Sequence, residues 1–146
     1  MSGREYGPTD ADLQWCHEAV QGVSRTFALT VDVLEEPMAS HICLGYLLCR
    51  VADTVEDAGH IPPETQRSLL ETYRDAVDPD EQTDIADFRA SIDEWLPAPS
   101  ERTDDWVVVA ESPTIVATFE QFAPEVQSAI VPPVVEMVDG MAMFVD

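Results

Sequence analysis

Two aspartates in the sequence have the spacing of one helical turn and could hold a metal ion together. Asp53 and Asp57 are four residues apart, so in a helix they share a face, with Glu56 beside them and Arg50 one turn earlier. Mg²⁺ typically takes one or two carboxylates in proteins, while waters and phosphate oxygens complete its coordination. The group therefore predicts a clamp for a magnesium-bound diphosphate.

The acidic composition offers an alternative interpretation of the same residues. The 146-residue chain has 29 acidic residues, and at that frequency roughly 0.15 chance matches to Asp-x-x-Glu-Asp are expected. Asp53 and Asp57 could therefore be ordinary surface carboxylates. Their position favours the clamp, because they end the most hydrophobic helix of the chain, where an uncompensated charge is costly. Asp80 and Asp84 have the same spacing in a polar setting, and we assign that pair to the surface.

A second candidate element is the run Ser24-Arg25-Thr26-Phe27, at the expected start of a helix. The exposed N–H groups of a helix start favour an anion, and the planar fork of Arg25 suits phosphate oxygens. The alternative for Ser24 is a plain N-cap, which spacing alone favours. Arg25 and Arg50 are two of only seven basic residues, all of them arginine, so each is more informative than in an ordinary sequence.

The other reactive residue types are interpreted as structural. The histidines lack ligand spacing, the tryptophans are sparse, and the three cysteines form no CxxC pair, which favours a reducing cytosol. These residues are His17, His41 and His60; Trp15, Trp95 and Trp106; and Cys16, Cys43 and Cys49.

Helices must position these side chains, because apolar residues recur at helical spacing along the whole chain. The central helix has a stripe too broad for a surface helix, formed by Ile42, Leu44, Tyr46, Leu47, Leu48, Val51 and Val55. Residues 106–110 favour a strand by propensity, but no second segment alternates with period two, so a helix is predicted there as well. The fold class is all-α, with some seven helices. The segments predicted to be helical are 10–22, a segment between Ser24 and Pro37, 37–58, a helix opened by Pro62-Pro63 and ending at Val77, 81–95, and a helix from 106 that is interrupted near Ser112-Pro113 and followed by 114–122 and 124–144.

Charge and hydropathy exclude several classes of protein. A net charge of −22 opposes binding to nucleic acid or to anionic lipid headgroups, although 45% hydrophobic residues are enough for a packed core. No apolar run is long enough to span a membrane, and Met1–Pro8 lacks the features of a secretory signal, so a cytoplasmic location is expected. The acidic residues are dispersed along the chain, which is typical of proteins from halophiles, because high salt screens the repulsion between the carboxylates.

The two candidate elements together resemble a known family. Ser24-Arg25-Thr26-Phe27-Ala28 and the run from Tyr46 through Arg50 and Asp53 to Asp57 are closely similar to the squalene/phytoene synthase family. Asp-Thr-Val-Glu-Asp and the closing Gly-Met-Ala segment are similar to the squalene synthase branch, and the acidic surface resembles the halophilic archaeal type. The resemblance implies the N-terminal part of the isoprenoid (terpenoid) synthase helical bundle.

The resemblance also implies an activity. Family members condense two farnesyl diphosphates head to head with Mg²⁺, through presqualene diphosphate, and squalene synthases then reduce the product with NADPH. By motif match, Asp53, Glu56 and Asp57 would hold Mg²⁺, and Asp53, Asp57 and Tyr46 would act at the reacting centre. The residues that would meet the diphosphate are Ser24, Arg25 and Arg50, and Phe27 would line the pocket.

The family's domain is longer than this chain, and its second Asp-rich motif is expected beyond Asp146. We therefore expect residues 1–146 to be the N-terminal portion of one synthase domain, with little activity alone and with the NADPH site mostly elsewhere. Alternatives are a phytoene or dehydrosqualene synthase, and a non-catalytic helical fragment or subunit that pairs with a separate C-terminal half. No membrane span is expected, although a peripheral membrane contact would suit release of an apolar product.

Overall fold

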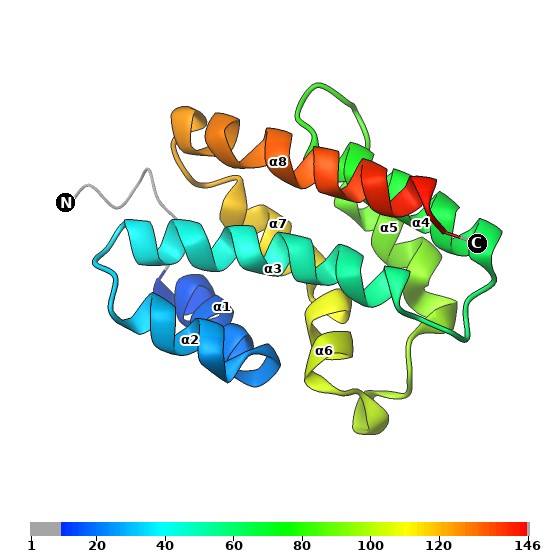
Figure 1. Cartoon of the computed structure of the whole chain (residues 1–146), viewed down its shortest axis with the longest axis horizontal. Helices are drawn as coiled ribbons and strands as arrows, with labels where there is room; N and C mark the ends of the chain where they lie inside the picture. Colours follow the sequence, from blue (N-terminus) through cyan, green and yellow to red (C-terminus); the bar gives the residue numbers. More distant parts are fainter. Residues whose placement is uncertain (1–9, 146) are drawn as a thin grey trace.

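The structure, a computed structural model, describes residues 10–145, and in that range it is all-α as predicted, without a strand (Figure 1). Residues 10–145 contain eight α-helices and two short 3₁₀ helices, Asp93–Trp95 and Pro99–Glu101. The α-helices are α1 (Asp10–Val23), α2 (Arg25–Asp32), α3 (Met38–Glu56), α4 (Pro63–Val77), α5 (Ile85–Ile92), α6 (Asp104–Ala110), α7 (Ser112–Phe119) and α8 (Pro124–Met143).

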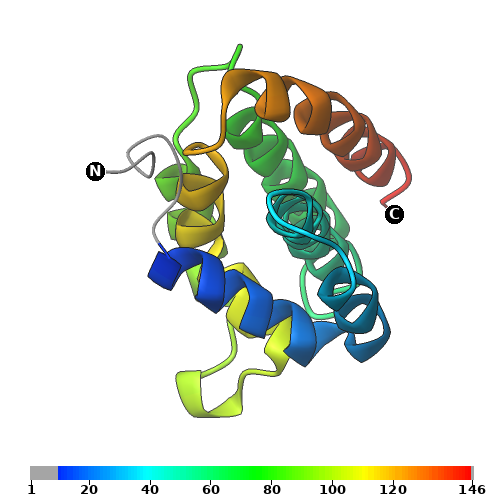
Figure 2. The ribbon, with the colours of Figure 1, turned by 90° about the vertical axis from the view of Figure 1, so that its left-hand side faces the viewer.

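Helix α3 is the centre of the fold. Figure 2 looks nearly along its axis, and α1, α2, α4, α6, α7 and α8 all contact it. Leu44, Leu47 and Val51 are fully buried, and burying such a side chain is worth about 1.5–3 kcal/mol. The prediction of an interior helix is confirmed. The inclusion of Ile42 in the core stripe is wrong, because this side chain is 42% exposed at the edge of α3.

Several predicted boundaries differ from the structure, and the helix predicted over 114–122 is α7, Ser112–Phe119. The helix expected over 81–95 begins only at Ile85, because the Asp84 side chain accepts a hydrogen bond from the Ala86 N–H and caps α5 there. Its last residues tighten into the 3₁₀ helix Asp93–Trp95. The segment after Ser24 is helical only to Asp32. The helix predicted from 106 is confirmed as α6, which begins at Asp104 because the Thr103 side chain caps it.

Consecutive residues at the start of α4 hold the ends of two other helices. The Gln66 side-chain amide donates to the carbonyl oxygens of Val55, Glu56 and Ala58, at 3.0, 2.9 and 3.0 Å. The Arg67 guanidinium donates to the carbonyl oxygens of Ala142 and Val145, at 3.1 and 2.6 Å. Helix ends leave carbonyl groups unpaired, so α4 stabilises the C-terminal ends of both α3 and α8.

Helix α8 runs along α3 on the side opposite α1 and α2 (Figure 1). Its C-terminal half packs on α4, where Arg74 donates to Asp139 at 3.1 Å. None of the helices in the described range combines the length and hydrophobicity needed to cross a bilayer.

Candidate functional site

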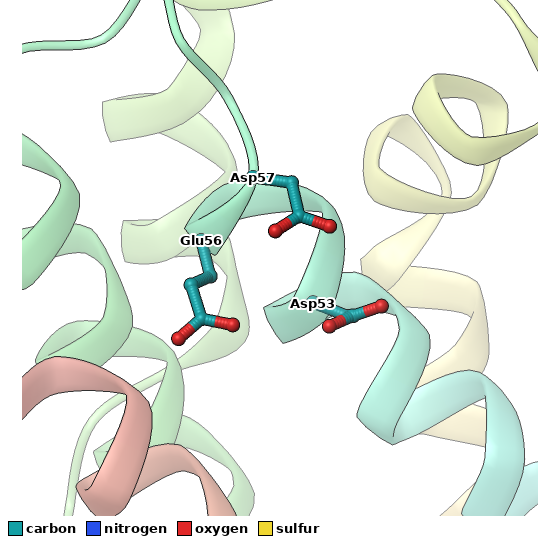
Figure 3. A group of neighbouring side chains, drawn as sticks. All are labelled: Asp53, Glu56 and Asp57. Carbon is teal, nitrogen blue, oxygen red and sulfur yellow. The ribbon is translucent and has the colours of Figure 1, made fainter. Parts of the chain in front are cut away.

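The predicted acidic cluster forms at the C-terminal end of α3. Asp53, Glu56 and Asp57 each offer a carboxylate oxygen, and these oxygens lie within 4.8 Å of one another. Figure 3 shows the Asp53 and Asp57 side chains on the same side of the last turn, with Glu56 extending beside them. Carboxylate oxygens are hard ligands of the type that Mg²⁺ takes from proteins, usually from one or two carboxylates, with water and phosphate in its other positions. The donor set therefore fits magnesium.

Electrostatics makes this cluster unfavourable without a cation. The C-terminal end of a helix carries partial negative charge, and the last turn of α3 has no basic residue. Burial, reinforced by the Asp57 carboxylate, raises the pKa of Asp53 and also the pKa of Glu56. Asp53 and Glu56 are therefore harder to ionise than usual, and a divalent cation in the cluster would relieve both the repulsion and the adverse helix dipole.

Arg50 lies one turn before Asp53 and is held mainly by a residue from another helix. Its Nε and Nη2 donate to the two carboxylate oxygens of Asp105 on α6, at 2.9 and 3.1 Å. Its Nη1 lies 3.6 Å from the Asp53 Oδ2. The hydrogen bond to Asp105 raises the pKa of Arg50, so its cation is fixed beside the cluster.

The second predicted element, around Ser24, lies at the start of α2. The Ser24 Oγ accepts a hydrogen bond from the Phe27 N–H at 3.1 Å, which is the N-cap arrangement that was the alternative for this residue. Arg25 is exposed, and it forms no ion pair with any residue in the described range. The Phe27 ring stacks on the Tyr46 ring of α3, with centroids 4.2 Å apart and an angle of 18° between the planes. The Ser24 segment is thereby joined to the central helix.

An open groove of about 780 Å³ lies between α2, α3 and α8. Its lining is mostly apolar, and it is open beside Gly45 of α3, where an added Cβ would meet only Ile130 Cγ2, at 3.9 Å. The Ile42 side chain is part of this lining, so it faces the open groove and not the core. The lining includes Phe27, Ile42, Tyr46, Ile130, Val134 and Met137.

Two smaller cavities continue from the groove to the acidic cluster. The first, of about 240 Å³, shares Tyr46, Cys49 and Met137 with the groove and is also lined by Asp53. The second, of about 250 Å³, is lined by Asp53, Asp57 and Asp105 and by the ring of His60. Asp53 therefore stands at the junction between an apolar channel and a polar chamber.

Several of the other reactive residue types are held by burial or by hydrogen bonds within the fold. Burial raises the pKa of Cys16 and of Cys43 to about 12, so both thiols stay protonated. His17 pairs with Ser40, and His60 with the Trp95 carbonyl oxygen, at 3.2 and 2.8 Å. The three tryptophans are partly buried against the core.

Asp105 and Gln66 were missed by the sequence analysis. Asp105 follows another acid, Asp104, in a chain rich in acids, and its partner Arg50 lies 55 residues away. Gln66 is a neutral residue in a polar run, although it is only 7% exposed. A pattern of helical spacing cannot reveal either contact, because both join separate helices.

The fold matches that of a solved structure. The chain superposes on a structure described as the complex of TcSQS with a ligand, with a TM-score of 0.74 and 24% identity. The match covers 94% of this chain and 36% of the solved one. This similarity supports the predicted isoprenoid synthase helical fold.

Sequence comparison identifies the family. The squalene synthase of Eremothecium gossypii is 30% identical over 136 residues, which are 92% of this chain and 28% of that protein. The squalene synthase of Bos taurus is 29% identical (93% and 29%), and the presqualene diphosphate synthase of Botryococcus braunii 27% (95% and 31%). The chain thus spans less than a third of the length of these relatives. Because the family model for squalene/phytoene synthase matches residues 20–146, the chain belongs to the squalene/phytoene synthase family.

Proposed function

We propose that this chain forms the part of a squalene-synthase-type prenyltransferase that binds farnesyl diphosphate with Mg²⁺. In the whole enzyme, two farnesyl diphosphates would be joined head to head through presqualene diphosphate, and NADPH would reduce the product to squalene. The observation that carries the proposal is the continuity between an apolar groove and an acidic cluster that fits magnesium. A ligand with an apolar chain and a diphosphate at one end has this distribution of polarity.

Each proposed site residue has a role that follows from its position. Asp53, Glu56 and Asp57 would hold Mg²⁺, which when bound acts as a Lewis acid on the leaving diphosphate. Arg50 presents a cation next to Asp53, and this cation offsets part of the repulsion between the anionic ligand and a strongly acidic protein. These groups would bind and orient the polar end of the substrate.

The rings of Phe27 and Tyr46 would contact the apolar part of the substrate next to its diphosphate. Tyr46 lines both the groove and the cavity next to Asp53, and its stacking on Phe27 fixes its ring. The ring faces would cover the first carbons of the prenyl chain and exclude water from them. Ser24 and Arg25 lie at the α2 start that carries Phe27, and we propose that Arg25 contacts a diphosphate there while Ser24 orders the turn.

The setting of the whole enzyme is proposed from the same resemblance. We propose a cytoplasmic enzyme with a peripheral membrane contact for release of its apolar product. We also propose that residues 1–146 are the N-terminal portion of a synthase domain, and that a C-terminal half supplies further metal ligands. The chain alone is then expected to form no squalene from farnesyl diphosphate, Mg²⁺ and NADPH, a result that product analysis by gas chromatography checks directly.

Binding to this chain tests the proposed ligand without requiring turnover. Isothermal titration calorimetry with excess Mg²⁺ would compare farnesyl diphosphate with inorganic diphosphate. Gly45→Leu fills the groove and should weaken farnesyl diphosphate binding about tenfold, while inorganic diphosphate binding should stay unchanged. Gly140→Leu is the matched control, because Gly140 is also helical and a Cβ there meets nothing within 4 Å. Unchanged farnesyl diphosphate binding by Gly45→Leu would contradict the groove's role.

A further inference from the structure

We infer that Asp105 is a positioning residue, which holds the Arg50 guanidinium so that its Nη1 edge faces the anion bound at the acidic cluster. This inference rests on the proposed function and adds a residue from outside the two sequence elements that predicted the site. Asp105 itself would not touch the substrate.

The geometry of the pair supports this role. Arginine has five N–H donors in one plane, and Asp105 engages two of its nitrogens with both carboxylate oxygens. Such a bidentate pair fixes the plane of the guanidinium as well as its distance. The remaining nitrogen, Nη1, is the one nearest to Asp53. The orientation of Arg50 is thus determined by α6, while its backbone belongs to α3.

The position of Asp105 is itself well determined. It is the second residue of α6, which is capped by the Thr103 side chain and packs against both α1 and α3. The neighbouring Trp106 lies against the His60 ring, with centroids 5.5 Å apart. Asp105 lines the polar chamber next to the cluster together with Asp53 and Asp57. A rigid helix end therefore delivers the carboxylate to the wall of the site.

Two physical effects of Asp105 have opposite signs, which makes the inference testable. As a negative charge, Asp105 repels an incoming diphosphate and neutralises Arg50, so its removal would strengthen anion binding. As a positioning group, it keeps a long flexible side chain in one orientation, so its removal would weaken anion binding. If Asp105 is a positioning residue, its removal weakens anion binding overall, because the loss of orientation outweighs the loss of repulsion.

The experiment measures binding of inorganic diphosphate in excess Mg²⁺ by calorimetry, for the 146-residue chain. We expect Asp105→Asn to weaken binding about tenfold, and Asp105→Glu, which keeps the carboxylate, to recover part of the loss. Asp104→Asn is the matched control, since it removes the same charge from the adjacent residue, which faces Gly22 on α1. It should bind as the wild type does or slightly more tightly. Asp105→Asn binding as tightly as the wild type, or more tightly, would overturn the inference.

A second readout needs no ligand. The Arg50 Nε–H, donated to Asp105, should exchange with solvent at least about tenfold more slowly than that of the exposed Arg25 in ¹⁵N NMR. Asp105→Asn should remove this protection, whereas Asp104→Asn should keep it. Rapid exchange of the Arg50 Nε–H in the wild type would contradict a stable Arg50–Asp105 pair. A wild-type chain with a protected Arg50 that binds no magnesium diphosphate would instead overturn the proposed function, and the anion role of Asp105 with it.

Discussion

Two pairs of aspartates in this chain have the same spacing but different places in the fold. Asp53 and Asp57 lie one turn apart at the end of a buried helix, and with Glu56 they bring three carboxylates within reach of one ion. Asp80 and Asp84 are both exposed and lie in the irregular segment before α5. A spacing of four residues brings side chains together only where a continuous helix joins them.

The two pairs also differ in what their charges do to the protein. Asp84 caps the start of α5, where the helix dipole favours a negative charge and its carboxylate accepts a hydrogen bond. Asp57 is the C-cap of α3, where the dipole opposes a negative charge. One pair therefore includes an acid that stabilises the fold, whereas the other gathers acids where they destabilise it. An unfavourable position is a better sign of a binding role than acidity is.

The largest expected difference between the pairs is in metal-dependent binding. Replacing both Asp53 and Asp57 with Asn should weaken magnesium diphosphate binding by more than about a hundredfold, because the ligands themselves are removed. Replacing both Asp80 and Asp84 with Asn removes the same charge and should leave binding nearly unchanged. Calorimetry on the two double variants measures both. Equal losses would mean that only overall charge matters.

A second prediction concerns the caps that hold the first pair in place. Gln66→Ala removes the side-chain amide that donates to three carbonyl groups at and just after the end of α3, and should lower the free energy of unfolding by about 2 kcal/mol. Gln66→Lys offers an ammonium to the same carbonyls and should restore part of this loss. Urea unfolding in the absence of divalent cations measures both variants. An Ala variant as stable as the wild type would contradict the capping role.

The cap on the second pair should matter less. Asp84→Ala removes one side-chain hydrogen bond at an exposed helix start and should cost about 1 kcal/mol. Asp84→Asn keeps an oxygen that can accept the same hydrogen bond and should cost a smaller amount. Thermal unfolding followed by circular dichroism would rank the three proteins. A larger loss for Asp84→Ala than for Gln66→Ala would reverse the comparison.

The smallest expected effect is a pH dependence at the first pair. Because the folded-state pKa values of Asp53 and Glu56 are raised, their ionised forms destabilise the folded protein at neutral pH, and this penalty disappears as the pH falls through those values. Asp53→Asn with Glu56→Gln should therefore be more stable than the wild type at neutral pH without Mg²⁺. Urea unfolding at several pH values should show this advantage shrinking toward acid pH. An advantage that stays constant across this pH range would mean that the two carboxylates carry no ionisation penalty.

Much of this molecule was predictable from its sequence, and the failures share a cause. The helices and the clustering of Asp53, Glu56 and Asp57 follow from local periodicity, which one segment contains by itself. The Arg50 contact with Asp105 and the caps from Gln66 and Arg67 depend on how helices pack, so no single segment records them. Ile42 was misassigned to the core for the same reason, because its side chain lines the groove between α3 and α8.

The adjacent caps on α4 have a mechanical consequence for the groove. Gln66 fixes the end of α3 and Arg67 the end of α8, whereas no side-chain hydrogen bond within residues 10–145 joins these two helices directly. Side-chain hydrogen bonds to α4 thus fix both helices at the acidic end, whereas near Met38 and Glu125 the open groove lies between them.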